Sequence, residues 1–157
     1  MRIRGPRIRR QRDGRYLLKL SEDERKLLRS LPGQITFGLG SSDPGTMRLF
    51  PPAYSSDPDA EADYQDLVHQ SLLEHHRDAL AVLEQTASSQ SLDEVEAQSW
   101  LVALNDIRLV LGTRLDVKED GDPLPAGHPN AGAMSLYHWL TWLQEQLVEA
   151  LASAGTV

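Results

Sequence analysis

The chain has 157 residues, 40% of them hydrophobic and 25% charged, which is enough for one hydrophobic core and too little for two. It has no cysteine, which excludes disulfides, thiolate metal sites, a cysteine nucleophile and a thiol redox switch. The formal charge of −7 is unevenly spread: residues 1–29 hold eleven basic and four acidic side chains (+7), and the other 128 residues hold five and nineteen (−14). We therefore expect two surfaces of opposite charge.

The start of the chain is basic and is not followed by a long apolar stretch. No run approaches the roughly 20 apolar residues that a membrane crossing needs, and the pattern is not that of a secretory signal. We therefore expect a cytoplasmic protein.

The first elements in chain order are an arm, a strand and a short helix. Residues 1–14 are rich in arginine, contain glycine and proline and lack an apolar period, which predicts a flexible arm. The short apolar run within residues 15–20 predicts a strand. Ser21 and Glu24 have the spacing of a capping box, so a short helix is expected to begin there and to end at Pro32.

A loop and a long helix follow. Proline and glycine recur through residues 32–59, which predicts a loop. Asp57, standing before a proline, predicts the N-cap of a long helix that ends near Ala87. Further along the chain, residues 118–133 are expected to be a polar loop, and Ser135 is expected to open the last helix, in which leucines recur every three or four residues.

The central helix is expected between the long helix that ends near Ala87 and the polar loop of residues 118–133. Ser91 and Glu94 have the spacing of a second capping box, and residues 92–111 are apolar around much of the helix circumference, as a helix buried on most sides would be. Gly112 is predicted to lie just past its C-terminus. Residues 113–117 are expected to pair with the strand that follows the arm, because a single strand would leave its backbone groups unpaired.

Together these elements predict a mainly α fold of about four helices, three long and one short, with a small two-stranded β element. We expect an arm over residues 1–14 and a single helical domain over residues 15–157.

Polar side chains interrupt the central helix and follow its end. Asn105 and Arg108 are one turn apart on one face, and an arginine that reaches Asp106 or a carboxylate of the long helix would make charge-assisted hydrogen bonds. Two interpretations stay open: a structural network that satisfies the end of the helix, or a partner-binding surface. The residues concerned are Asn105, Asp106, Arg108 and Arg114.

Seven arginines lie in the first fifteen residues. Arginine presents a fork of donors that suits nucleic-acid phosphates as well as an acidic protein surface. The alternatives are a solubilising tail and an arm that folds back on the acidic body. No aromatic residue lies among them, so base stacking on a single strand is not indicated. The candidates for contact with a nucleic acid or an acidic partner are Arg2, Arg4, Arg7, Arg9, Arg10, Arg12 and Arg15.

The histidines were considered as possible metal ligands. His69, His75 and His76 lie on the long helix, but no two histidines have the i,i+4 spacing of a helical zinc site. The sequence therefore predicts no metal, no cofactor and no enzyme. A metal-assisted hydrolase using the region of His69 and His75 remains an alternative from another class of protein.

One segment resembles a known family. The sequence WLVALNDIRLVLGTRL, residues 100–115, resembles the signature segment of the actinobacterial AosR-like family, named for aerobic oxidative stress response regulators. Other pieces agree in order, including the arginine-rich start, GRY at residues 14–16 and LYHWL at residues 136–140.

The resemblance implies a cytoplasmic, transcription-associated regulator of the oxidative stress response. It would act by contact with a protein of the transcription machinery, a sigma factor being one candidate. The family's redox sensing is attributed to cysteines, which this chain lacks, so that property is not carried over. A further alternative is a helical homodimeric scaffold or adaptor, with the helix that carries Trp139 and Trp142 as its interface.

Overall fold

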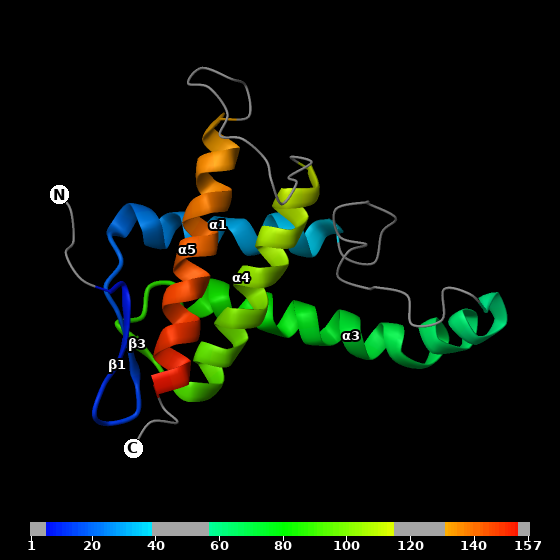
Figure 1. Ribbon diagram of the computed structural model, residues 1–157, viewed down its shortest axis with the longest axis horizontal. Helices are drawn as coiled ribbons and strands as arrows, with labels where there is room; N and C mark the ends of the chain where they lie inside the picture. Colours follow the sequence, from blue (N-terminus) through cyan, green and yellow to red (C-terminus); the bar gives the residue numbers. More distant parts are fainter. Residues whose placement is uncertain (1–5, 39–56, 115–130, 154–157) are drawn as a thin grey trace.

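A computed structural model of the chain describes residues 6–38, 57–114 and 131–153. Within these ranges four helices and a three-stranded antiparallel sheet form a mainly α fold, which confirms the predicted fold class (Figure 1). The helices are α1 (Glu22–Gly38), α3 (Pro58–Thr86), α4 (Glu94–Arg114) and α5 (Ala131–Ser153), and the strands are β1 (Ile8–Arg10), β2 (Tyr16–Leu18) and β3 (Ser91–Leu92).

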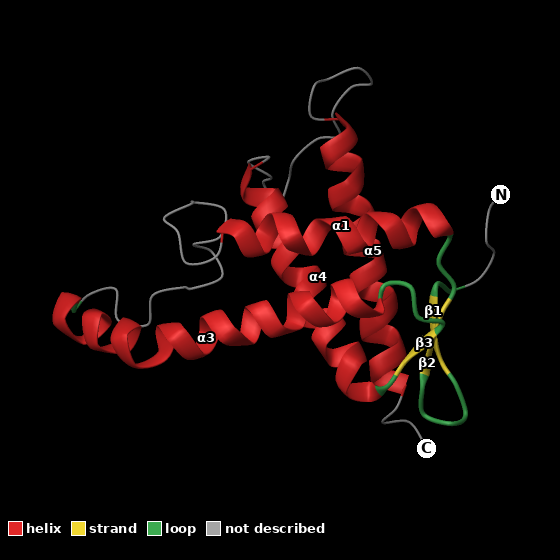
Figure 2. Cartoon of the chain, turned by 180° about the vertical axis from the view of Figure 1, so that it is seen from behind, coloured by secondary structure: helices red, strands yellow, loops and turns green. Residues whose placement is uncertain are grey.

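Helix α4 is central, as its apolar circumference predicts. It contacts α1, α3, α5 and β3, and the first half of α3 extends away from the other helices (Figures 1 and 2). No described helix is long and apolar enough to cross a membrane. The burial of apolar side chains is the main driving force for packing. The large apolar side chains of α4 that are almost completely buried are Trp100, Leu104, Ile107 and Val110.

The prediction of a flexible arm is wrong for residues 8–10, which form β1. Ile8 is 2% exposed, pairs in register with Leu18, and belongs to a strand that packs against α5. A turn with Gly14 at φ 88° joins β1 to β2, and a positive φ is easily adopted only by glycine. The strand was missed because it is only three residues long and has a single apolar side chain. Residues 1–5 lie outside the described ranges.

The strand expected within residues 15–20 is present as β2, but its predicted partner is wrong. β2 pairs with β1 on one edge and with β3 on the other, so the sheet has three strands instead of two. Residues 113–114 belong to α4, and residues 115–117 lie outside the described ranges. The two strands that pair with β2 are therefore residues 8–10 and 91–92, both of which precede the expected partner, residues 113–117, in the chain.

The start of α1 is as predicted and its end is not. The amide of Ser21 donates to Glu24 Oε1 at 2.8 Å, and the amide of Glu24 donates to Ser21 Oγ at 3.2 Å, which completes the capping box. The helix continues past Pro32, because Leu31 and Ile35 keep the buried stripe in contact with α3 and α4. Packing thus outweighs the missing amide donor of one proline, and α1 has 17 residues.

The starts of α3 and α4 are N-capped, the second of them not where predicted. Asp57 caps α3 by accepting a hydrogen bond from the amide of Ala60 at 3.2 Å, as expected. At the start of α4 the reciprocal box joins Asp93 and Glu96, at 2.9 and 2.7 Å. The expected box was two residues too early, because Ser91 belongs to β3.

The boundaries of α4 and α5 facing the second undescribed segment also differ. Gly112 lies inside α4, where a side-chain Cβ would come within 3.1 Å of the Tyr137 ring on α5, so close helix packing explains this glycine. Helix α5 begins at Ala131, before the expected Ser135. Residues 39–56 of the first predicted loop and residues 118–130 of the second lie outside the described ranges.

Candidate partner-binding site

Helix α4 carries a polar pair on the side that faces α3. Asp106 is 2% exposed and is the one buried charged residue within the described ranges. Its Oδ2 atom lies 2.7 Å from Nδ1 of His76 on α3. Burial raises the pKa of the Asp106 carboxyl above its ordinary value, and the hydrogen bond with His76 offsets this only in part.

The prediction that an arginine pairs with Asp106 is therefore wrong. Successive helical residues are about 100° apart, so Arg108 lies about 200° around α4 from Asp106 and faces α5 instead. The partner of the carboxylate comes from a residue 30 positions away in the sequence.

On the α5 side, Arg108 Nη2 donates to Asn105 Oδ1 at 3.1 Å, so these two residues do share a face. Gln144 Nε2 on α5 approaches the same oxygen at 3.5 Å. Two neighbouring atoms, Arg108 Nε and Gln144 Oε1, are buried and have no hydrogen-bond partner in the described part of the chain. The fourth expected member, Arg114, has a side chain outside the described residues.

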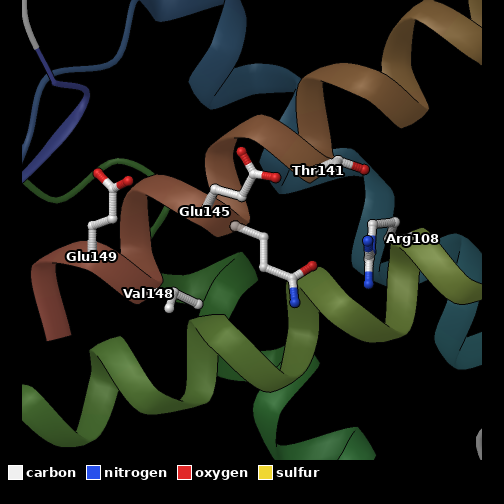
Figure 3. Close-up of a pocket in the computed structure, with 6 residues that line it drawn as sticks. Arg108, Thr141, Glu145, Val148 and Glu149 are labelled. Carbon is white, nitrogen blue, oxygen red and sulfur yellow. The ribbon is translucent and has the colours of Figure 1, made fainter. Parts of the chain in front are cut away.

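Arg108 and Gln144 are also among the residues that line a hollow of about 290 Å³ between α4 and α5 (Figure 3). Glu145 and Glu149 are exposed on α5, and neither makes an ion pair with any residue that the structure describes. Val148 is 46% exposed. The lining combines a cation, two anions and an apolar contact, which suits noncovalent recognition. It consists of Arg108, Thr141, Gln144, Glu145, Val148 and Glu149.

Arg7 is held by the body of the protein. Its Nη1 lies 3.1 Å from Glu24 Oε1, and its guanidinium stands 5.9 Å from the centre of the Trp142 ring. Its backbone amide donates to Gln146 Oε1 at 3.0 Å. We therefore remove Arg7 from the arginines available to a partner.

The other arginines of the predicted arm differ in their environments. Arg15 donates to Ser91 Oγ at 2.8 Å and to Ser91 O at 3.2 Å, which ties β2 to β3. Arg9, Arg10 and Arg12 are exposed on the β1–β2 hairpin, residues 8–18, and their side chains have no hydrogen bond or ion pair with the described residues. Arg2 and Arg4 lie outside the described ranges.

The histidines do not gather into a metal centre in the described ranges, where no group of three or more histidine and acidic side chains could hold an ion. His75 is exposed, His76 contacts Asp106, and the side chain of His69 is not among those described. The hydrolase alternative thus has no support from the described geometry.

Sequence reasoning missed His76 and Gln144 as parts of the two polar clusters. For Gln144 a signal was present, because it lies four residues after Leu140 and three before Leu147, both fully buried. A polar residue on such a leucine stripe needs a polar partner. For His76 no local pattern indicates the contact, because its partner is on another helix.

Comparison with known proteins gives one family and several relatives. The family described as a domain of unknown function, DUF2017, matches residues 4–151. The chain is 34% identical over 128 residues to the oxidative stress regulators AosR of Mycobacterium tuberculosis (strain H37Rv) and Mycobacterium bovis (strain AF2122/97). Each match covers 69% of this chain and 58% of the relative, so the match spans less than two thirds of those proteins. No solved structure matches significantly.

Proposed function

The chain belongs to the DUF2017 family. From its similarity to the AosR proteins we propose that it is a transcription-associated regulator of the oxidative stress response that acts by contact with another protein in the cytoplasm. The relatives are named as oxidative stress regulators, which favours a regulator over an enzyme. The AosR-like resemblance of residues 100–115 supports the link to transcription.

The single observation that carries the proposal is the hollow between α4 and α5. Its lining combines Arg108 with two exposed glutamates, Glu145 and Glu149, and neither glutamate makes an ion pair with a described residue. Val148 beside them and Trp142 on the same helix remain exposed at 46% and 37%. Exposed apolar side chains next to polar groups without partners are typical of an interaction surface.

The chain has no cysteine, so the proposed regulator does not detect oxidants through its own thiols. This separates it from regulation by thiol oxidation.

Crosslinking in cells tests the proposal. A photo-crosslinking amino acid replaces Val148 at the hollow, and in a second strain it replaces Val95, which is 73% exposed at the start of α4. We expect the probe at position 148 to capture a sigma factor or an RNA polymerase subunit, and the probe at position 95 to capture neither. Failure of both probes to capture any transcription protein would contradict the proposal.

The β1–β2 hairpin favours a second contact, with nucleic-acid phosphates. Arg9, Arg10 and Arg12 present guanidinium groups on an ordered hairpin, and no exposed aromatic lies between them that would suggest base stacking. We therefore propose that the hairpin touches the backbone of duplex DNA near the protein partner.

Gel retardation of a labelled DNA duplex tests this contact. Replacing Arg9, Arg10 and Arg12 by glutamine should weaken binding and reduce the slope of log K against log salt by about two to three. The control replaces Lys26 and Arg77, exposed cations on α1 and α3, by glutamine and should change the slope less. Equal retardation by the triple variant and the wild type would show that the hairpin does not touch DNA.

A further inference from the structure

Both ends of the β1–β2 hairpin meet at one residue, Arg7. The amide of Lys19, just after β2, donates to Arg7 O at 2.7 Å, and Arg7 Nη1 donates to Lys19 O at 3.2 Å. These two bonds close the base of the hairpin, as the turn with Gly14 closes its tip. The three arginines proposed to contact DNA therefore stand on a hairpin whose base is fixed by the backbone and the guanidinium of one residue.

Arg7 also joins this base to two helices. Its Nη1 atom lies 3.1 Å from Glu24 Oε1 at the start of α1, and its backbone amide donates to Gln146 Oε1 on α5 at 3.0 Å. Its guanidinium stands 5.9 Å from the centre of the Trp142 ring, also on α5. Contacts with α1 and α5 together restrict how the hairpin can turn relative to the body of the protein.

Glu24, the partner of Arg7, is itself held in place. Its Oε1 atom accepts from the amide of Ser21 in the capping box, and its Oε2 atom accepts from Trp139 Nε1 at 3.2 Å. The side chains of Arg7 and Glu24 are only 17% and 16% exposed. An ion pair that is largely enclosed and has further hydrogen bonds is screened less by salt than a surface pair, and its geometry is fixed.

This enclosure distinguishes Arg7 from the exposed arginines of the hairpin. Arg9, Arg10 and Arg12 are exposed, and their side chains make no ion pair with the described residues. Arg7 Nη1 is engaged by a carboxylate and by a backbone carbonyl, so a phosphate would have to displace an acidic partner. Arg7 is therefore placed to orient the neighbouring arginines and not to contact a phosphate itself.

A hairpin with a fixed orientation lowers the cost of binding. Ordering a flexible segment on association consumes part of the interaction free energy, because backbone and side-chain freedom is lost. In both views the hairpin lies beside the C-terminal half of α5, at one side of the molecule (Figures 1 and 2). Held there in the free protein, it loses less freedom when its arginines meet a duplex.

We propose that Arg7 is a positioning residue for the DNA contact: through Glu24 on α1 and Trp142 on α5, it holds the hairpin in the orientation in which its three exposed arginines meet the phosphates of a duplex. The inference rests on the proposed function, since it assigns a role to a residue that lies behind the proposed DNA contact.

Gel retardation of a labelled DNA duplex by two variants with opposite changes in charge tests the proposal. Arg7→Met removes a positive charge and Glu24→Gln removes a negative one, and each removes the ion pair at the base of the hairpin. Charge alone would make Glu24→Gln bind DNA more tightly than the wild type. If Arg7 positions the hairpin, both variants should instead bind about five- to tenfold more weakly.

The salt dependence of binding separates positioning from direct contact. Each phosphate that a cation neutralises contributes about 0.9 to the slope of log K against log salt. Arg7→Met should leave this slope unchanged, because the three hairpin arginines still meet phosphates once DNA is bound. A slope reduced by about one would show that Arg7 itself contacts a phosphate, and the inference would be wrong.

Hydrogen exchange measures the hairpin in the free protein. The amide of Gln11 donates to Arg15 O and that of Lys19 to Arg7 O, both at 2.7 Å, so both amides report whether the hairpin is formed. In Arg7→Met they should exchange severalfold faster than in the wild type. Equal exchange rates in the two proteins would overturn the inference.

Matched controls carry the same charge changes elsewhere. Arg77→Met and Glu74→Gln replace exposed residues of α3 and should leave the affinity for DNA within about twofold of the wild type. His76→Ala controls for stability, because it should weaken the fold at a place away from the hairpin. At a temperature at which it remains folded by circular dichroism, it should bind DNA as the wild type does.

Failure of the inference and failure of the proposed DNA contact are distinguishable. If the wild type binds the duplex and both variants of the ion pair bind it equally well, only the inference is wrong. Weaker binding by Arg7→Met with tighter binding by Glu24→Gln would mean that charge alone decides, which also rejects the inference and keeps the contact. If the wild type binds no duplex, the DNA contact is wrong and the inference fails with it.

Discussion

Asp106 and Arg108 are two residues apart in α4, and their surroundings are opposite. Asp106 faces α3, is 2% exposed and lies 2.7 Å from a histidine nitrogen. Arg108 faces α5 at the edge of a hollow, and its Nε atom has no partner within the described ranges. One polar residue is enclosed and paired, and the other is left with an unmatched donor.

This difference assigns separate roles to residues that the sequence presents as one cluster. A paired, enclosed polar group fixes how two helices pack, and its loss costs stability. On the other side, a buried donor without a partner costs stability, and it lies on a helix face whose neighbouring hollow is lined by glutamates that make no ion pair with the described residues. We therefore assign the structural interpretation to the α3 side of α4 and propose the partner-binding interpretation for its α5 side.

The largest expected effect on the free energy of unfolding comes from removing the partner of the buried Asp106. His76→Ala leaves the Asp106 carboxylate buried without its partner, and breaking such a pair costs about 3 kcal/mol. Urea denaturation measures this loss. His75→Ala on the same helix is the control, because His75 is exposed, and should change the free energy of unfolding by less than about 0.5 kcal/mol. Equal losses for the two variants would contradict the structural role of the pair.

Arg108→Met is the corresponding substitution on the side of α4 that faces α5, to be compared with His76→Ala on the side that faces α3. It removes a buried donor that lacks a partner and keeps the apolar stem, so we expect a change in the free energy of unfolding of less than about 1 kcal/mol. The comparison between the two sides breaks down if this variant loses as much stability as His76→Ala.

The smallest expected effect is the pH dependence of the Asp106 contribution. Because burial raises the pKa of this carboxyl above its ordinary value of 3.8, the folded chain keeps a proton there over a range of pH in which the unfolded chain has lost it. The free energy of unfolding contributed by this group therefore falls as pH rises from 3.8 through the raised pKa.

Urea titrations at a series of pH values measure this contribution by comparison with Asp106→Asn, which does not titrate at this position. The free energy of unfolding of the wild type minus that of the variant should decrease over the interval. An increase with pH would mean that the pKa of Asp106 is lowered on folding.

The parts of the fold that sequence reasoning predicted are those that depend on nearby residues. The box of Ser21 and Glu24 spans three residues, and the cap of Asp57 on Ala60 spans three as well. The circumference of α4 predicts its central position because apolar residues on all sides need neighbours on all sides.

Errors arose where a distant contact outweighed a local preference. Pro32 favours the end of a helix, yet packing of Ile35 against its neighbours carries α1 past it. Ile8 looks isolated among arginines, yet its pairing opposite Leu18 and the contact of β1 with α5 order the strand. Each of these outcomes depends on residues that no short sequence window contains.

By itself the sequence determined the mainly helical fold, the starts of α1 and α3, the uneven charge and the absence of thiol chemistry, because these follow from composition and from contacts within about one helical turn. The tertiary structure alone decided that Asp106 meets His76, 30 residues away, and that Gln144 meets Asn105 across 39 residues. The physical reason is that packing the helices fixes which faces meet, and only then does one polar group find a partner while another is left without one.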